Sequence, residues 1–359
     1  MRTRARIAVS LLALPAGLLF AEGVTRVFGL APVPVPEVQG AVFGDSPEPR
    51  LGFENLPGGE QRIVYRDRHG AVVRDVLSRV NRQGFRGPEV AEEKPPGLFR
   101  IVCLGDSHTF GYGVGEGESW PCVLESALRA RPDGSRFEVL NCAVNAYDAE
   151  QSLALLELRL LKFHPDLVLL GFFVNDTAIR GVQAPPEQEP PSWIMKLSDP
   201  HRKGFVRWLR EHSRFVDLIA DGAFNRDSLG FFSRSRSALF GEDYEGWIRV
   251  RAALVRARER LAAERIGFVV LLLPFLVEEE GHLGSTHAMG IVRAFCAQSS
   301  IPCLDLEPAF AGRDLGELRV HPRDFHAGPE AHRILGQAAA QELAPYLDAG
   351  RLETPEQDR

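Results

Sequence analysis

FRIVCLGDSHTFG, residues 99–111, joins a short apolar run to a polar turn that contains a serine. The run lacks the alternation of apolar and polar residues that is typical of a strand with one face in water, so it predicts a strand that is buried on both faces. Gly105, Asp106 and Ser107 follow it. The stretch therefore predicts a central strand of a parallel sheet, with the hydroxyl of Ser107 presented at the sheet edge.

The same kind of apolar run recurs along the chain and alternates with helical patterns. The five runs are Arg100–Leu104, Phe137–Asn141, Leu167–Phe173, Phe268–Leu273 and Ile301–Leu306. Apolar stripes at helical spacing lie at residues 120–128, 153–163, 247–261 and 331–343. This alternation predicts an α/β fold with three layers, α/β/α, around a five-stranded parallel sheet.

The first thirty residues differ from the rest. Arg2, Arg4 and Arg6 precede an uncharged run from Ile7 to Ala21, a pattern typical of an export signal. Because no small-residue cleavage site precedes Glu22 cleanly, we expect an uncleaved signal anchor, an N-terminal helix that holds the protein in the membrane facing the periplasm or cell exterior. A removed signal peptide is the alternative, since the run is shorter than the roughly 20 residues of a span. Both alternatives predict an exported protein.

Changes in composition divide the chain after residue 30. Residues 31–97 begin with alternating prolines, which predict an extended stalk, and continue with a hairpin pattern around residues 67–70, which predicts a small accessory β segment. Residues 98–348 contain the strand and helix alternation, and residues 349–359 form a tail. Within the domain, residues 177–243 carry paired prolines and clustered aromatic residues. They predict an insertion that acts as a lid.

Composition excludes several functional classes. The chain has 42 Lys and Arg against 48 Asp and Glu, a net charge of −6, so no basic field favours nucleic acid as a partner. The five cysteines contain no CxxC pair, which excludes a cysteine zinc site and a disulfide framework. The glycine-rich residues 111–117 match no nucleotide-binding motif and predict a loop near the rim of the site.

Candidate functional residues follow the predicted strands, where ligands of open α/β sheets bind. Ser107 follows the first strand, Asn175 the third, and Asp324 and His326 the fifth. A hydroxyl, an imidazole and a carboxylate are the groups that acyl transfer through an activated serine requires. Asp324 and His326 are two residues apart on an extended segment, so their side chains share one side and Asp324 can orient the imidazole. The amide of Asn175 can donate to an oxyanion.

Other interpretations of these residues are open. A serine after a strand is often a helix cap, and Asp-x-His is often a surface turn. A second hypothesis is a metal cluster of His321, Asp324, His326 and His332, which the absence of HExxH and CxxC weakens. GxSxG is also absent, which argues against the α/β-hydrolase arrangement of the same three groups.

Three blocks of the sequence resemble those of the SGNH, or GDSL-type, hydrolase superfamily. The blocks are LGDSHTFG at residues 104–111, GFFVND at 171–176 and DFHAGPEAH at 324–332, in the order expected for that family. A GFRG element at residues 84–87 is similar to that of exported bacterial members with an amino-terminal anchor. The resemblance implies a flavodoxin-like sheet and an esterase or lipase-like activity.

A fourth block, NCAVNAYD at residues 141–148, resembles the family's glycine block but has Ala143 and Ala146 where glycines are expected. The resemblance implies an oxyanion hole made by the backbone of Ser107, the backbone of Ala146 and the amide of Asn175. Alanine retains the N–H group, so we expect it to donate provided that the local backbone avoids positive φ. The Asp-x-His spacing is also shorter than the more usual Asp-x-x-His, and Asp324 is still expected to orient the base.

Together these features predict a serine hydrolase that acts on a small-molecule or glycan ester. His326 removes the proton of Ser107, Ser107 attacks the ester carbonyl, and water cleaves the acyl-enzyme, so no metal or organic cofactor is needed. The alternative is an O-acyltransferase that passes the acyl group to cell-envelope polysaccharide. A third class is an anchored binding protein whose site has lost activity. The sequence carries no indication of oligomeric state.

Overall fold

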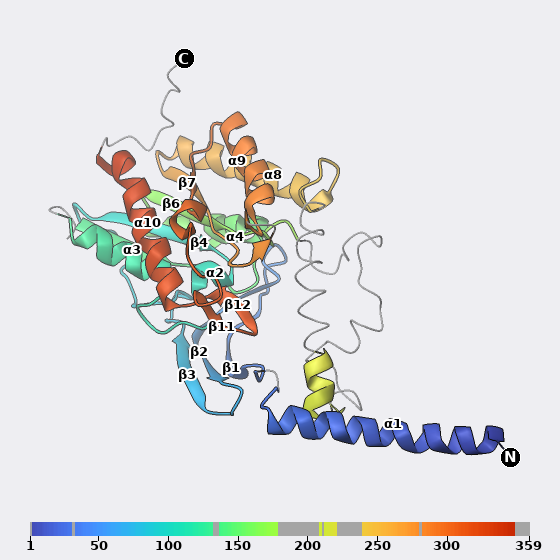
Figure 1. The fold of residues 1–359 in the computed structure, drawn as a ribbon. Coiled ribbons are helices and arrows are strands. Elements are labelled where there is room, and N and C mark those ends of the chain that lie inside the picture. The colour runs from blue at the N-terminus through green and yellow to red at the C-terminus, as the bar shows by residue number, and fades with distance from the viewer. Residues whose placement is uncertain are drawn as a thin grey trace.

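The computed structural model describes residues 2–30, 33–131, 136–178, 208–209, 212–220, 239–279 and 282–348. A five-stranded parallel sheet lies at the centre of this part of the chain (Figure 1). Its strands are β4 (Phe99–Gly105), β5 (Phe137–Asn141), β6 (Leu167–Phe172), β7 (Gly267–Leu272) and β10 (Cys303–Asp305). The predicted sheet is therefore confirmed, with each boundary within two residues of the observed strand.

The strand order is β10-β7-β6-β4-β5. The chain passes from β4 to β5 at one edge and then crosses to β6 on the other side of β4, so the direction of winding reverses at β4. This is the flavodoxin-like order, in which ligands bind beyond the carboxyl ends of the strands at the point of reversal. In the register, Gly105 at the end of β4 lies opposite Gly171 of β6. The loops that follow β4 and β6 therefore begin side by side at the same edge of the sheet.

Helices cover the sheet on both faces. The helices are α3 (Trp120–Arg129), α4 (Ala149–Leu155), α8 (Glu245–Ala263), α9 (Thr286–Gln298) and α10 (Pro329–Asp348). Helix α3 packs against α10, and α4 packs against α8 (Figure 1). The three-layer α/β/α fold expected from the sequence is thus present.

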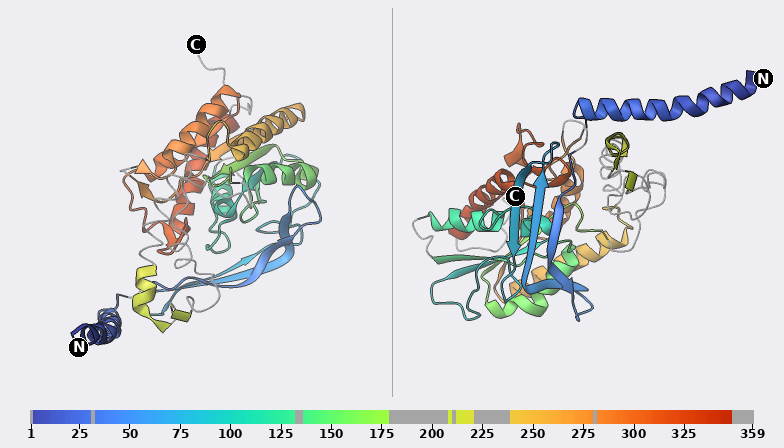
Figure 2. Two further views of the ribbon diagram at one scale, coloured as in Figure 1. Left: turned by 90° about the vertical axis from the view of Figure 1, so that its right-hand side faces the viewer. Right: turned by 90° about the horizontal axis from the view of Figure 1, so that it is seen from below.

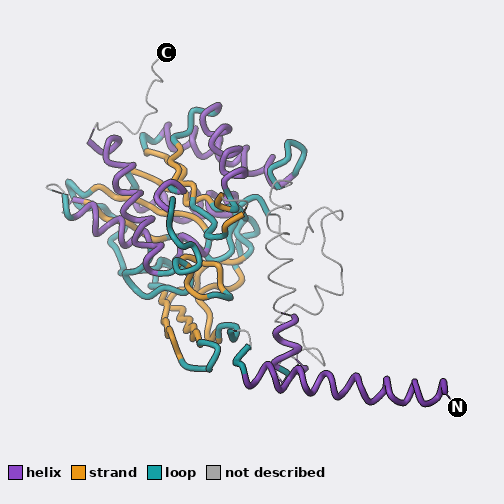
Figure 3. The backbone as a smooth tube through the Cα atoms, viewed as in Figure 1, coloured by secondary structure: helices purple, strands orange, loops and turns teal. Residues whose placement is uncertain are grey.

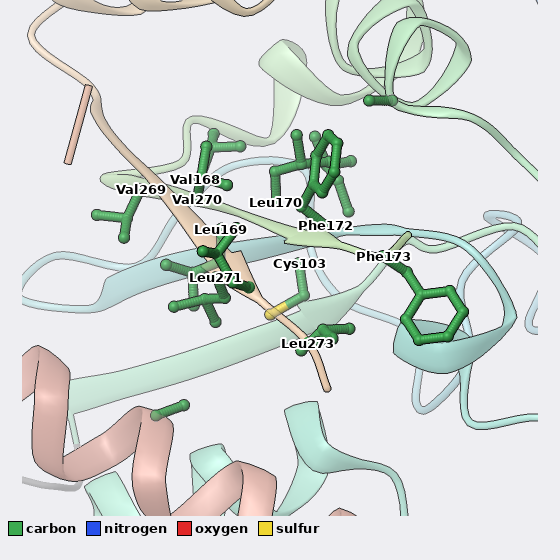
Figure 4. Close-up of a cluster of buried hydrophobic side chains, with 14 of the residues drawn as sticks. Cys103, Val168, Leu169, Leu170, Phe172, Phe173, Val269, Val270, Leu271 and Leu273 are labelled. Atoms are coloured by element: carbon green, nitrogen blue, oxygen red, sulfur yellow. The ribbon is translucent and has the colours of Figure 1, made fainter. Parts of the chain in front are cut away.

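The core lies between these layers. Every residue of β6 and β7 is buried, as the absence of alternation predicts. Figure 4 shows the side chains of Cys103, Leu170 and Val270, from three neighbouring strands, within this apolar cluster. Each fully buried Val or Leu stabilises the fold by roughly 1.5–3 kcal/mol, so the sheet is a rigid support for the loops at its edge.

The helix predicted at residues 153–163 is shorter and less regular than expected. It begins at Ala149, before the apolar stripe, where Asp148 and Gln151 form a capping box. After Leu155 the chain continues as a π-helix at Leu156–Leu160 and a 3-10 helix at Leu161–Phe163. It ends at His164, where φ is 52° and a proline follows. Proline disfavours the helical conformation in the residue before it, so the end of the helix was predictable. The π-helix at Leu156–Leu160 was not predicted.

A second sheet is antiparallel and consists of β1 (Glu37–Asp45), β2 (Phe53–Arg66) and β3 (Val72–Arg79). The predicted hairpin joins β2 to β3, and the Asp67 carboxylate accepts the backbone N–H groups of His69 and Ala71 in its turn. Figure 3 shows these strands beside the loops of the larger domain. We call residues 37–79 the accessory sheet.

Helix α1 (Arg2–Val27) extends away from the domain (Figure 2). No helix in the described part of the chain is both long and apolar enough to cross a membrane. The transmembrane helix expected within residues 1–30 is therefore not supported, because charges at both ends confine the uncharged run to Ile7–Ala21. Most of the insertion predicted at residues 177–243, and all of the tail at 349–359, lie outside the described residues.

Candidate active site

Ser107 lies in a tight turn at the carboxyl end of β4, where it begins the short helix α2 (Ser107–Phe110). Gly105 has a φ of 143°, and a Cβ atom on it would lie 2.7 Å from the carbonyl oxygen of Gly171. Only glycine allows this conformation and this close approach. Asp106 then caps the helix by accepting the N–H of His108 over 2.8 Å. The turn places the Ser107 hydroxyl at the edge of the sheet.

The three predicted catalytic side chains converge. Ser107 Oγ lies 2.8 Å from Nε2 of His326, and Nδ1 of His326 lies 2.6 Å from Oδ1 of Asp324. Asp324 and His326 belong to β12 (Asp324–Ala327), which pairs with β11 (Arg319–His321). Alternate residues of a strand point to the same side, so the Asp-x-His spacing suffices to bring the carboxylate to the imidazole. With Nδ1 donating to Asp324, Nε2 is left to accept the serine proton.

The charges around the imidazole suit it to act as a base. Burial alone would lower the pKa of His326, but the charge and hydrogen bond of Asp324, together with the charge of Asp106, raise it above its ordinary value. Burial alone would raise the pKa of Asp324, but the charge and hydrogen bonds of His326 and the hydroxyl of Tyr65 lower it. Asp324 therefore stays a carboxylate at neutral pH, and its negative charge stabilises a protonated His326.

Aromatic rings surround the imidazole. The rings of His108 and Phe173 are stacked, with centroids 3.6 Å apart. The ring of His326 lies 4.8 Å from that of His108 and 4.7 Å from that of Tyr112. These contacts restrict the rotation of His326, which a base needs if it is to stay within reach of Ser107.

The predicted oxyanion residues lie in loops that follow neighbouring strands. Nδ2 of Asn175 donates to Oδ2 of Asp106 over 3.1 Å, which ties the loop after β6 to the turn that carries Ser107. Asn175 is exposed, whereas Asp106 is fully buried and burial raises its pKa. The amide of Asn175 has two hydrogens, so it can donate to Asp106 and to a ligand at the same time.

The backbone conformation that we expected of Ala146 is not the one observed. Its φ is 65°, in the left-handed region, so the backbone does not avoid positive φ. This conformation costs an alanine about 1 kcal/mol because its Cβ approaches the backbone oxygen, and glycine adopts it without that cost. The loop thus imposes a glycine-like conformation on an alanine. Because the direction of an N–H group depends on the backbone and not on the side chain, the N–H of Ala146 points as it would in a glycine at this position, and positive φ does not prevent donation.

Sequence reasoning missed Tyr65, which lies in β2 of the accessory sheet and is fully buried. Its hydroxyl donates to Oδ2 of Asp324 over 3.1 Å. The contact joins residues 259 positions apart, and nothing in the local pattern around Tyr65 indicates it. Burial and the charge of Asp324 raise the pKa of Tyr65, so its hydroxyl remains a neutral donor.

Arg86 is a second residue whose role was not predicted, although the GFRG element that contains it was recognised. Its buried guanidinium donates to the carbonyl oxygens of Phe110 at 2.8 Å and Gly115 at 3.0 Å, and also to those of Gly111 and Val114. Burial lowers the pKa of Arg86 to about 10, so it remains charged. It holds together the loop that follows the Ser107 helix.

The residues of the alternative metal hypothesis are engaged separately. Nε2 of His321 lies 3.0 Å from the carbonyl oxygen of Arg66, and Nδ1 of His332 accepts the N–H of Trp120 over 3.1 Å. Burial lowers the pKa of His332 to about 3. Among the described residues, no group of three or more His, Cys, Asp or Glu side chains is placed to hold a metal ion. His321 and His332 therefore do not join Asp324 and His326 in one cluster.

Comparisons with known proteins place this arrangement in context. The model of the GDSL-like Lipase/Acylhydrolase family matches residues 103–334. The structure of a lipolytic protein of the G-D-S-L family from Desulfitobacterium hafniense DCB-2 is 16% identical, with 67% of this chain and 98% of that chain covered and a TM-score of 0.38. TesA is 13% identical, with 68% of this chain and 98% of that chain covered and a TM-score of 0.41. Axe2, an acetylxylan esterase from Geobacillus stearothermophilus, is 12% identical, with 68% of this chain and 94% of that chain covered and a TM-score of 0.40. No curated protein matches the chain. The family match spans Ser107, Asn175 and His326.

Proposed function

Because this chain belongs to the GDSL-like lipase/acylhydrolase family and is an esterase of that family, we propose that it cleaves carboxylic esters through Ser107, His326 and Asp324 by way of an acyl-enzyme. The observation that carries the proposal is the continuous path from the hydroxyl to the carboxylate. It consists of the 2.8 Å contact from Ser107 Oγ to His326 Nε2 and the 2.6 Å contact from His326 Nδ1 to Asp324. Both distances allow a hydrogen bond, and thus a proton transfer, without rearrangement.

In the proposed reaction, His326 Nε2 takes the proton of Ser107 as Oγ attacks the ester carbonyl. The N–H groups of Ser107 and Ala146 and the amide of Asn175 donate to the oxygen that becomes negative. His326 returns the proton to the leaving alcohol, which departs and leaves an acyl group on Ser107. A water molecule gives its proton to His326 and attacks this acyl group, and the carboxylic acid leaves as Ser107 recovers its proton.

The test is hydrolysis of p-nitrophenyl esters of increasing acyl length together with labelling by a fluorophosphonate, which reacts with activated serines. We expect Ser107→Ala to lose labelling and at least about 1,000-fold in kcat, and His326→Ala to lose a similar factor, because the two groups act as one unit. Ser126→Ala is the matched control, since the Ser126 hydroxyl is exposed and donates to the carbonyl oxygen of Cys122 in its own helix. Full labelling of Ser107→Ala would overturn the proposal.

The molecule that accepts the acyl group from Ser107 decides which reaction the enzyme catalyses. Water gives an esterase, whereas a sugar hydroxyl gives O-acyl transfer to a polysaccharide, and the acyl-enzyme is common to both. Incubation with an acetyl ester and an oligosaccharide separates the two outcomes by product analysis. We expect free acetate as the main product. A failure of Ser107 to label in the intact protein would instead favour the inactive binding protein.

We also propose that the protein is exported. The support is Arg2, Arg4 and Arg6 ahead of the uncharged residues Ile7–Ala21. A fusion of residues 1–40 to a reporter that is active only outside the cytoplasm tests this. We expect activity from the natural sequence and its loss when Leu11 and Leu12 are both replaced by Arg. Reporter activity that survives this replacement would contradict export by this segment.

A further inference from the structure

The carboxylate of Asp324 is held from two directions. Oδ1 accepts the Nδ1–H of His326 at 2.6 Å and the backbone N–H of the same residue at 3.1 Å. Oδ2 accepts the hydroxyl of Tyr65 at 3.1 Å. The first two donors come from β12 itself, whereas the third comes from the accessory sheet. Both oxygens of the carboxylate are therefore bonded, each to a different part of the chain.

Further contacts hold this part of the accessory sheet against the active-site loops. Arg74 donates through Nε to the carbonyl oxygen of Gly113 over 3.0 Å. The ring of His321 packs against that of Tyr65, with centroids 5.2 Å apart, and its Nε2 lies 3.0 Å from the carbonyl oxygen of Arg66. Gly113 and His321 lie in the loop after the Ser107 helix and in β11, respectively. The two loops that carry the reacting groups thus meet at the β2–β3 hairpin.

Gly113 shows how closely Tyr65 fits. Its φ is 79°, and a Cβ atom at this position would collide with the Tyr65 hydroxyl. The loop can pass over the hydroxyl only because this residue has no side chain. The position of Tyr65 is therefore set by packing as well as by its hydrogen bond.

A carboxylate bonded through one oxygen can rotate, because the terminal torsion of an aspartate side chain has a broad, roughly two-fold energy profile. A donor on the second oxygen restricts this rotation and keeps Oδ1 directed at His326. The tautomer and orientation of the imidazole depend on that oxygen. The Tyr65 hydroxyl on Oδ2 thus acts on Ser107 through the Asp324 carboxylate and the His326 imidazole.

We propose that Tyr65 is a positioning residue of the Ser107 site, so that the accessory sheet completes the active site of this enzyme. The inference rests on the proposed function of Ser107, His326 and Asp324. Tyr65 lies outside residues 103–334, which the family model matches, so the segment that supplies it is an addition to the matched domain.

The test is Tyr65→Phe in the full-length protein, which removes the hydroxyl and retains the ring. We expect kcat to fall on the order of tenfold with KM unchanged, as for the loss of one hydrogen bond to a charged group. The acid limb of the pH profile should move to higher pH. Without the hydroxyl, only His326 stabilises the charge of Asp324, so the interaction with a protonated imidazole becomes stronger and the pKa of His326 rises. The reaction needs the neutral imidazole, which then forms only at higher pH. Among the residues that the structure describes, the other titratable groups near this imidazole are Asp106, His108, Tyr112 and His332.

Tyr147→Phe is the matched control. The Tyr147 hydroxyl is also buried and donates to the accessory sheet, at the carbonyl oxygen of Phe53 over 2.5 Å. We expect this variant to lower the melting temperature and to leave the pH profile in place. An equal shift of the pH profile in both variants would reduce Tyr65 to a structural residue and overturn the proposal.

A double-mutant cycle gives a second test. If Tyr65 acts through Asp324, its replacement should cost less than twofold in the Asp324→Asn background, measured as the rate of fluorophosphonate labelling of Ser107. The same cost in both backgrounds would contradict the inference. Wild-type turnover and its loss in Ser107→Ala establish the proposed function in the same experiment, so a failure of Tyr65→Phe to change kcat would count against the Tyr65 inference alone.

Discussion

Asn175 and Asp106, which follow neighbouring strands of the parallel sheet, are joined by a hydrogen bond of 3.1 Å from Nδ2 to Oδ2. Asp106 also caps the helix that begins with Ser107. The buried carboxylate therefore fixes both the nucleophile turn and the proposed oxyanion donor. This arrangement requires no motion to bring the two together before an ester binds.

Replacement of Asn175 by Ala should lower kcat by about 100-fold or more and change KM little, because the loss of one preorganised oxyanion donor acts mainly on the transition state. Steady-state kinetics with a p-nitrophenyl ester measures this. The control is the fluorophosphonate labelling of Ser107, which should still occur, since Ser107 and His326 remain in place. A rise in KM of about 100-fold with unchanged kcat would instead assign Asn175 to binding of the ester in the ground state.

Asp106→Asn removes the charge beneath the site and keeps one side-chain oxygen, which can retain the helix cap but cannot also accept from Asn175. The charge of Asp106 contributes to raising the pKa of His326, so its removal should lower that pKa. The reaction needs neutral His326, and the acid limb of kcat/KM should therefore move to lower pH. This is the opposite sign to Tyr65→Phe. A pH profile that stays in place, in a variant with unchanged melting temperature, would mean that the charge of Asp106 does not reach the imidazole.

Much of this arrangement was predictable from the sequence because the responsible forces are local or general. Buried strands lack alternation and residues 67–70 have the composition of a turn, so the parallel sheet and the β2–β3 hairpin were both expected. Ser107 and Asn175 were expected to meet because carboxyl ends of parallel strands share one edge. Asp324 and His326 were expected at the same edge, after the fifth strand, but they lie in the separate antiparallel pair β11–β12, which reaches Ser107 from outside the parallel sheet.

The features that were missed depend on tertiary contacts. The hydrogen bond from Tyr65 to Asp324 spans 259 positions, and the apolar pattern around Tyr65 would be the same for any buried strand. The positive φ of Ala146 is a local strain that the loop imposes against the preference of the residue. The carbonyl oxygens that Arg86 binds converge only when the loop after Ser107 folds over it. Such relationships come from packing and leave no periodic trace in the sequence.

Ala146→Gly tests the strain in the proposed oxyanion loop. Glycine removes the steric cost of φ 65°, about 1 kcal/mol, but its unfolded chain has more entropy to lose, by roughly 0.5–1 kcal/mol. The free energy of unfolding should therefore change by less than about 1 kcal/mol, as measured by urea denaturation, with kcat maintained or raised. Ala146→Val should be clearly less stable than either, because a branched side chain tolerates this region poorly. A glycine variant with kcat lowered tenfold would show that the methyl group itself positions the loop.

Arg86→Met should be the most destabilising of these changes. Arg86 is buried, and its guanidinium donates to the carbonyl oxygens of Phe110, Gly111, Val114 and Gly115, with the charges of Glu116 and Glu118 nearby. Methionine fills the space of the aliphatic stem and leaves these oxygens without their donor, at a cost of about 3 kcal/mol. Urea denaturation measures the loss, and Arg62→Met, whose exposed ion pair with Asp75 contributes little, should show no measurable change. Because the loop that Arg86 holds also contains Tyr112, we expect kcat to fall as well, in the folded protein below its melting temperature. Unchanged stability in Arg86→Met would mean that water satisfies those oxygens and that the GFRG arginine serves some other purpose.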